Sequence, residues 1–126
     1  MENLTIEATK YTPVIILNAQ EGSFTFTGKS YPENTFDFYS PVMKWIETYF
    51  ESLANKTTKI DMDIIYFNSS SSKLFFDFFD ILEEAYQDGH KLEVNWFYDQ
   101  DNESAHEAGE DFQKDFEDLP IHLVEK

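Results

Sequence analysis

The order in which strand-like and helix-like hydrophobic patterns follow one another most constrains the fold of this chain. Alternating or short apolar runs predict strands, and apolar residues repeating every three or four positions predict helices. The predicted order is an edge strand at 4–8, a hairpin of 12–18 and 23–28, a helix over 42–53, a strand at 59–68, a helix at 71–87, a strand at 91–99, a helix at 102–116 and a final short strand at 121–126. Strands that alternate with helices form open α/β sheets with a parallel portion, and we predict this class.

The segment before the first helix allows two starting points. Ser40-Pro41 would supply a cap and a first helical residue, whereas Asn34 or Thr35 would cap a longer helix that bends at Pro41. In both cases the helix is amphipathic, with apolar side chains on one side only. Amphipathic helices predict a mixed sheet with the helices packed mainly on one face.

The composition indicates a single domain over residues 1–126 and excludes several classes of function. Hydrophobic residues make up 41% of the chain, enough for a core without cross-links. The absence of cysteine excludes disulfides, thiolate zinc sites and a cysteine nucleophile. A formal charge of −16 disfavours contact with nucleic acid, because phosphate-backbone binding needs Lys and Arg. No apolar run could span a membrane and no signal peptide is recognisable, so we predict a cytoplasmic protein that binds no membrane.

No group of residues predicts catalysis, a cofactor or a metal. The chain has no G-x-S-x-G elbow and no glycine-rich phosphate loop. Residues 99–110 space their acidic side chains as a calcium loop does, but Ser104 stands where that loop needs glycine. Asp61 and Asp63 lie in mid-strand, where we expect them to face solvent. The sequence therefore predicts a protein that is not an enzyme and that acts by binding other proteins.

Four consecutive serines, 69–72, lie between the strand that ends at Asn68 and the following helix. Hydroxyl groups at a helix N-terminus can cap free backbone N–H groups. They can also accept a phosphate, whose negative charge the positive end of the helix dipole stabilises. One cap needs one hydroxyl, so capping alone does not account for four serines.

A helical projection of 71–87 places Phe76 on the solvent-facing side of the helix, together with Lys73. An exposed aromatic side chain about one turn beyond the serines is a candidate contact for a partner protein. The alternative is that Phe76 packs beneath a terminal segment. The sequence does not decide between these two interpretations.

Three motifs resemble, in this order, those of the SiaC family of bacterial regulatory phosphoproteins: "SYPENTFDFY", "IDMDIIYFNSSS" and "LEVNWFYDQDNE". The resemblance covers roughly residues 12–116 and implies a single α/β domain similar to STAS domains. The family carries a phosphoacceptor threonine in an "N-T-S-S" stretch. Asn68 matches the asparagine and Ser69 occupies the threonine's place, with Ser70 and Ser71 as rival acceptors.

The resemblance also implies the partners. A cognate protein kinase phosphorylates the acceptor and a PPM-type phosphatase reverses the reaction. In the best-understood branch of the family, the unphosphorylated form binds a diguanylate cyclase and promotes cyclic-di-GMP synthesis. The alternative function is that of an anti-sigma factor antagonist, which would share the fold and the phosphorylation switch but bind an anti-sigma kinase.

The "SYPEN" stretch has two interpretations. Tyr31-Pro32 fixes an extended turn before the first helix, and Glu33 and Asn34 suit the first turn of that helix. Alternatively, this loop lies beside Ser69 and forms part of the face that binds the kinase or the cyclase. The residues predicted to contact partners are Tyr31, Glu33, Asn34, Asn68, Lys73 and Phe76.

Overall fold

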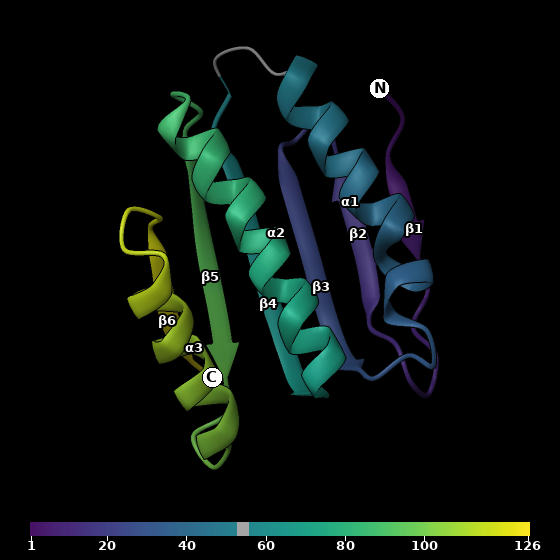
Figure 1. Cartoon of the computed structure of the whole chain (residues 1–126), viewed down its shortest axis with the longest axis vertical. Coiled ribbons are helices and arrows are strands. Elements are labelled where there is room, and N and C mark those ends of the chain that lie inside the picture. The colour runs from purple at the N-terminus through teal and green to yellow at the C-terminus, as the bar shows by residue number, and fades with distance from the viewer. Residues whose placement is uncertain (53–55) are drawn as a thin grey trace.

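The computed structural model describes residues 1–52 and 56–126, which form one six-stranded sheet and three helices (Figure 1). In chain order the elements are β1 (Leu4–Ile6), β2 (Val14–Asn18), β3 (Ser23–Ser30), α1 (Thr35–Ser52), β4 (Thr58–Phe67), α2 (Ser69–Gln87), β5 (Leu92–Tyr98), α3 (Glu103–Asp115) and β6 (Ile121–Glu125). The predicted order of strands and helices is confirmed, including both short terminal strands.

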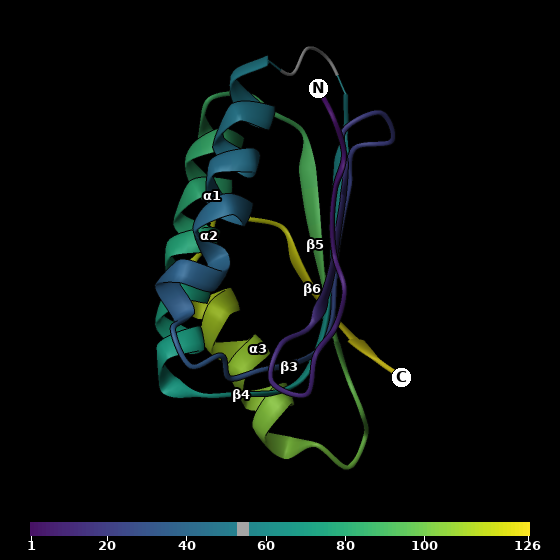
Figure 2. The same ribbon diagram turned by 90° about the vertical axis from the view of Figure 1, so that its right-hand side faces the viewer.

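The sheet is mixed, and its strands follow one another in space as they do in sequence. β1, β2 and β3 pair antiparallel, and β3, β4, β5 and β6 pair parallel. Each of the three helices connects two parallel strands. All three lie on the same face of the sheet and leave the other face uncovered (Figure 2). The predicted fold class is confirmed, because the sheet is mixed and the helices pack on one of its faces.

Asparagine side chains set the starting points of the helices. The Asp37 N–H donates to Asn34 Oδ1 at 3.1 Å, so α1 begins at Thr35 and runs through Pro41. Of the two predicted starting points, the longer helix is therefore the observed one. Pro41 is exposed, so water can reach the Asp37 carbonyl that proline leaves without an intrahelical partner.

The hydrophobic core fills the space between the sheet and the three helices. Trp96 of β5 is fully buried, and its Nε1–H donates to the Ala105 carbonyl of α3 at 2.9 Å. Gly109 lets α3 approach this ring closely, because a Cβ atom at that position would lie 2.6 Å from Trp96 Cδ1 and from Leu123 Cδ2. Helix α3 is thereby held against the last two strands.

Strand β4 changes its alternation near its end. Gly28 of β3 pairs with Ile64, but the next residue, Lys29, pairs with Tyr66, so Ile65 is an extra residue in the ladder. The Ile65 carbonyl accepts a hydrogen bond from Asn102 Nδ2 at 2.9 Å instead. The bulge turns Phe67 toward the core and Tyr66 away from it.

Apolar residues on both sides of this strand, at Ile65 and Phe67, predict that its end is buried on both faces, and this prediction is wrong. Ile65 is 42% exposed and Tyr66 54% exposed, because both lie where no helix covers the sheet. Phe67 alone enters the core, with ring centroids 5.3 Å from Phe75 and 6.0 Å from Trp96.

Across the part of the chain that the structure describes, no helix has the length and apolar character needed to cross a membrane.

Candidate functional site

The serine run and the "SYPEN" loop meet at one edge of the sheet, where β3 and β4 end and α1 and α2 begin (Figure 1). Parallel pairing brings these strand ends together. The Asn68 N–H donates to the Ser30 carbonyl at 3.1 Å, which joins the start of one loop to the start of the other. The loop therefore lies beside the start of α2, as one of its two interpretations requires, and its contact with a partner stays a prediction.

Asn68 is the N-cap of α2. Its backbone is extended (φ −86°, ψ 176°), its Oδ1 accepts from the Ser71 N–H at 2.9 Å and its carbonyl accepts from the Ser72 N–H at 2.9 Å. The helix therefore begins at Ser69, two residues earlier than predicted. The cap expected from a serine hydroxyl is supplied by an asparagine, and no serine is needed for it.

The first three serines have different environments. Ser69 and Ser70 are exposed, whereas Ser71 is fully buried, with its Oγ 2.8 Å from Ser30 Oγ. A kinase could reach Ser71 only if the first turn of α2 unwound. The prediction of Ser71 as a rival acceptor is therefore wrong on accessibility, and Ser69 and Ser70 remain.

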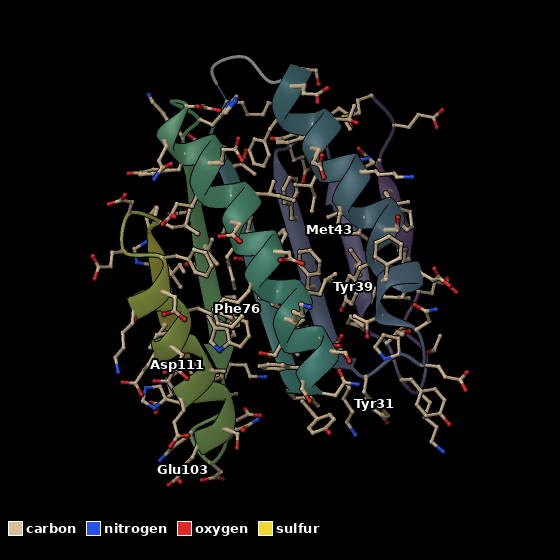
Figure 3. All side chains as sticks on the ribbon, viewed as in Figure 1. Tyr31, Tyr39, Met43, Phe76, Glu103 and Asp111 are labelled. Carbon is tan, nitrogen blue, oxygen red and sulfur yellow. The ribbon has the colours of Figure 1, made fainter. Side chains whose placement is uncertain are left out.

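Ser71 belongs to a chain of three buried hydroxyl groups. Ser30 Oγ lies 2.8 Å from Ser71 Oγ and 2.6 Å from the Tyr39 hydroxyl, so hydrogen bonds join β3, α2 and α1 at the start of α2. Burial raises the pKa of Tyr39 to about 12, and the hydrogen bond to Ser30 only partly offsets this effect. The phenol is therefore neutral at physiological pH. We call Ser30, Tyr39 and Ser71 the hydroxyl chain (Tyr39 is labelled in Figure 3).

The surroundings of Ser69 suit a phosphate. Within the described residues, the N–H groups of Ser69 and Ser70 have no hydrogen-bond partner, as expected for the first two positions of a helix. Lys73 is exposed and lies four residues after Ser69, which places both on one side of α2. One accessible hydroxyl thus lies at the positive helix end beside two free donors, with an ammonium group on the same side of α2.

Phe76 does not lie on an exposed face. Its ring is half-buried, with centroids 5.2 Å from Phe112 and 5.9 Å from Phe116, and it lies between α2 and α3 (Figure 3). The alternative interpretation, packing beneath a terminal segment, is the observed one. Phe76 therefore packs α3 against α2. Its predicted contact with a partner protein assumed an exposed side chain, and the side chain is not exposed.

Two further tyrosines join Tyr31 at this edge of the sheet. The ring of Tyr31 meets that of Tyr11 edge-on at 5.3 Å and that of Tyr66 at 5.5 Å. Tyr11 is 50% exposed and Tyr66 54% exposed, and Glu33 helps to line a hollow beside Tyr11 and Tyr31. We call Tyr11, Tyr31 and Tyr66 the tyrosine cluster. Tyrosine is enriched in protein interfaces because it combines apolar area with a hydroxyl group.

Sequence reasoning missed Tyr11 and Tyr66 for separate reasons. Strict alternation from Ile60, Met62 and Ile64 would put Tyr66 on the core side of β4, and the extra residue at Ile65 reverses its direction. Tyr11 lies in a loop without periodicity, where its neighbourhood depends on the hydrogen bond from the Tyr31 N–H to the Tyr11 carbonyl at 2.7 Å. No signal in the sequence indicates that contact.

Residues 6–126 match the family described as SiaC family regulatory phosphoprotein. The chain belongs to this family. An uncharacterised protein of Pseudomonas aeruginosa strain UCBPP-PA14 is 36% identical over 115 residues, which cover 91% of this chain and 90% of that protein.

Solved structures agree with this assignment to the SiaC family. Apo-SiaC of P. aeruginosa is 32% identical, with a TM-score of 0.90 over 98% of this chain and 99% of that one. A chain in the crystal structure of the diguanylate cyclase SiaD in complex with its activator SiaC, from the same species, is 33% identical. Its TM-score is 0.91 over 98% of this chain and 99% of that one.

In this SiaC family protein, the structure bears out the helix-entry interpretation of the "SYPEN" stretch, and partner binding by this loop stays a prediction. The Asn34 side chain caps α1, which is a structural role. Glu33 is exposed and has no ion-pair partner among residues 1–52 and 56–126. Glu33, Tyr31 and Lys73 therefore stay as predicted partner contacts around Asn68 and Ser69.

Proposed function

We propose that this protein is a non-catalytic switch whose unphosphorylated form binds and activates a diguanylate cyclase and whose phosphorylation on Ser69 ends that binding. The observation that carries the proposal is the position of Ser69. It is the exposed first residue of α2, directly after the capping Asn68, where the family resemblance places the phosphoacceptor. Phosphate is added by a cognate protein kinase and removed by a PPM-type phosphatase.

The cyclase is the partner that the comparisons favour. SiaC of P. aeruginosa is the activator of the diguanylate cyclase SiaD and forms a complex with it. The tyrosine cluster and Glu33 offer this chain an aromatic and acidic contact surface beside Ser69. Such a surface suits a contact that a phosphate at its margin can disrupt.

The energetics favour a switch that turns binding off. In the free protein, the helix dipole and the unpaired N–H groups of Ser69 and Ser70 would stabilise the phosphate by about 0.3–1 kcal/mol. In a complex that covers Ser69, a dianion that the single charge of Lys73 neutralises only in part would cost several kcal/mol to desolvate. At about 1.4 kcal/mol per tenfold change, affinity would fall by roughly two orders of magnitude.

The deciding experiment incubates the protein with its cognate kinase and ATP and locates the phosphate by mass spectrometry. We expect phosphate on Ser69, no incorporation into Ser69→Ala, and normal incorporation into Ser70→Ala. Cyclase binding is then measured for both phosphorylation states. Phosphate on Ser70 would move the acceptor and keep the switch, whereas equal cyclase affinity for wild type and Ser69→Asp would refute it.

A further inference from the structure

The face of the sheet that no helix covers runs across all six strands (Figure 2). Four of these strands, β3 to β6, pair parallel, and parallel sheets are usually covered on both faces. Because side chains alternate along a strand, this surface is made by the residues that point away from the buried Phe24, Met62 and Val94. We call it the open face.

The open face is nearly neutral, although the chain as a whole has a formal charge of −16. Between β2 and β6 it carries three lysines and four carboxylates: Lys29, Lys59, Lys126, Asp61, Asp63, Glu93 and Asp99. All the lysine–carboxylate ion pairs among the described residues are formed by Lys59, with Asp61 at 4.0 Å, and by Lys126, with Asp63 at 2.8 Å and Asp99 at 3.7 Å. Most of the negative charge therefore lies on the helices, the loops and the edges of the sheet.

Apolar side chains lie between these charges on the open face. Ile16 of β2 and Ile65 of β4 are both exposed, and the half-buried Phe97 and Val124 pair across β5 and β6. Thr25 adds a β-branched side chain beside Ile16, its partner in the ladder. Surfaces of this kind allow a second sheet to pack on the first at a distance of about 10 Å.

We propose that two copies of the chain associate through their open faces, as two sheets packed face to face about a two-fold axis. The distribution of charge favours this occupant. A basic partner would be attracted to the helical side, where most carboxylates lie, and an anionic partner would be repelled by the net charge of −16. A second copy carries the same negative charge, so it can approach closely only where the surface is nearly neutral. The open face meets this condition, and packing through it puts the two acidic helical layers on the outside of the dimer.

The size of the open face predicts a weak dimer. Six strands at about 4.8 Å spacing are about 24 Å wide, and the eight residues of β3 at about 3.3 Å each are about 26 Å long. The face therefore covers about 600 Å² on each copy, or about 1,200 Å² for the pair, which is the lower end of the range for stable interfaces. The ion pairs of Lys59 and Lys126 would also lose part of their hydration in the contact. We therefore expect a dissociation constant in the micromolar to millimolar range.

The dimer leaves the acceptor serine accessible. Ser69 begins α2, which lies on the other side of the sheet from the open face (Figure 2). The Ser69→Asp variant should therefore dimerise as the wild type does. The inference thus goes beyond the proposed switch and does not depend on it.

The test measures the dissociation constant by sedimentation equilibrium for the wild type and for two double variants. Ile16→Glu/Thr27→Glu alters exposed positions of the open face, and Tyr86→Glu/Thr48→Glu alters exposed positions on the helices. Each double variant adds two negative charges to the chain. We expect the open-face variant to dimerise at least tenfold more weakly and the helix variant to stay within twofold of wild type. Added salt should strengthen the wild-type dimer, because it screens the repulsion between two acidic molecules; weakening by salt would overturn the inference.

A second measurement uses the wild type alone, so it does not depend on the folding of a variant. Nuclear magnetic resonance follows the backbone amides as the protein is diluted. The signals of Thr25, Asn95 and Phe97 on the open face should shift, and those of Thr48 and Tyr86 on the helices should not. A wild type that stays monomeric up to millimolar concentration would overturn the inference. Equal dissociation constants for the wild type and the open-face variant, or shifts confined to the helices, would overturn it as well.

Discussion

The hydroxyl chain of Ser30, Tyr39 and Ser71 predicts a specific ranking of substitutions. Ser30 stands in the middle, with contacts of 2.6 Å to Tyr39 and 2.8 Å to Ser71. Replacing Ser30 by alanine removes both hydrogen bonds and leaves two buried hydroxyl groups without a partner. Replacing either end, by Ser71→Ala or Tyr39→Phe, removes one bond and leaves Ser30 paired with the other end. We expect Ser30→Ala to be the most destabilising of the three.

The magnitudes follow from burial, because all three residues are at most 1% exposed. A neutral hydrogen bond contributes about 1 kcal/mol net, whereas a buried polar group left without a partner costs about 1–3 kcal/mol. Each end substitution should therefore lower the free energy of unfolding by about 1 kcal/mol, and Ser30→Ala by about 2–4 kcal/mol. The exposed Ser70→Ala should change it by less than about 0.5 kcal/mol.

Urea unfolding followed by far-UV circular dichroism and by tryptophan fluorescence, to which buried Trp96 and Trp45 both contribute, measures these differences. The double variant Ser71→Ala/Tyr39→Phe completes a thermodynamic cycle, and we expect it to be non-additive because both ends share Ser30. If Ser30→Ala is no more destabilising than either end substitution, the three hydroxyls do not act as a chain. A Ser71→Ala protein that is still phosphorylated on Ser69 would agree with a structural role for Ser71.

Three further predictions concern stability and helix geometry. Burial raises the pKa of Tyr39 from 10 in the unfolded chain to about 12 in the folded protein. The stability that the neutral phenol contributes is therefore fully present below pH 10 and is lost as the pH rises from 10 to 12. A pKa difference of two units corresponds to about 2.7 kcal/mol of unfolding free energy. Between pH 10 and 12 the Tyr39→Phe variant should therefore lose less stability than wild type does. Parallel plots of unfolding free energy against pH for the two proteins would contradict this prediction. Gly109→Ala should destabilise the protein by about 1–3 kcal/mol and shift Trp96 fluorescence, since its Cβ would lie 2.6 Å from that ring; an unchanged spectrum and midpoint would refute the close contact. Asn68→Ala should lower the unfolding free energy by about 1 kcal/mol and Asn68→Asp by much less, measured by thermal unfolding; equal losses would mean that the side chain does not cap α2.

The spacing of apolar residues along the sequence was enough to predict most of the fold. Apolar residues at helical spacing over 42–53 and alternation at 59–68 are local patterns that burial on one face imposes on the chain. They were enough for the element order and for a sheet covered on one side. The position of Ser69 at a strand–helix junction followed from the same boundaries.

The features that sequence reasoning failed to predict all depend on contacts between segments far apart in the sequence. The packing of Phe76 was left undecided because a helical projection allows one buried face, whereas α2 packs on the sheet and also on Phe112 of α3. Ser71 was treated as accessible because its partner, Ser30, lies forty-one residues away. The tyrosine cluster joins residues from three separate segments. Contacts of this kind leave no periodic trace, so sequence reasoning could not find them.

The extra residue in β4 changes which side chains of the strand point toward the core. Before Ile65 the even-numbered residues Ile60, Met62 and Ile64 point inward, and after it the odd-numbered Phe67 does. An uninterrupted strand of the same length would end with an outward side chain at position 67 and would lose its last anchor just before the chain leaves for α2. The single-residue offset lets β4 finish on an inward aromatic, and the next residue, Asn68, then faces both Ser30 and its own helix. The position of Ser69, the proposed acceptor, thus depends on the extra residue at Ile65, four residues upstream.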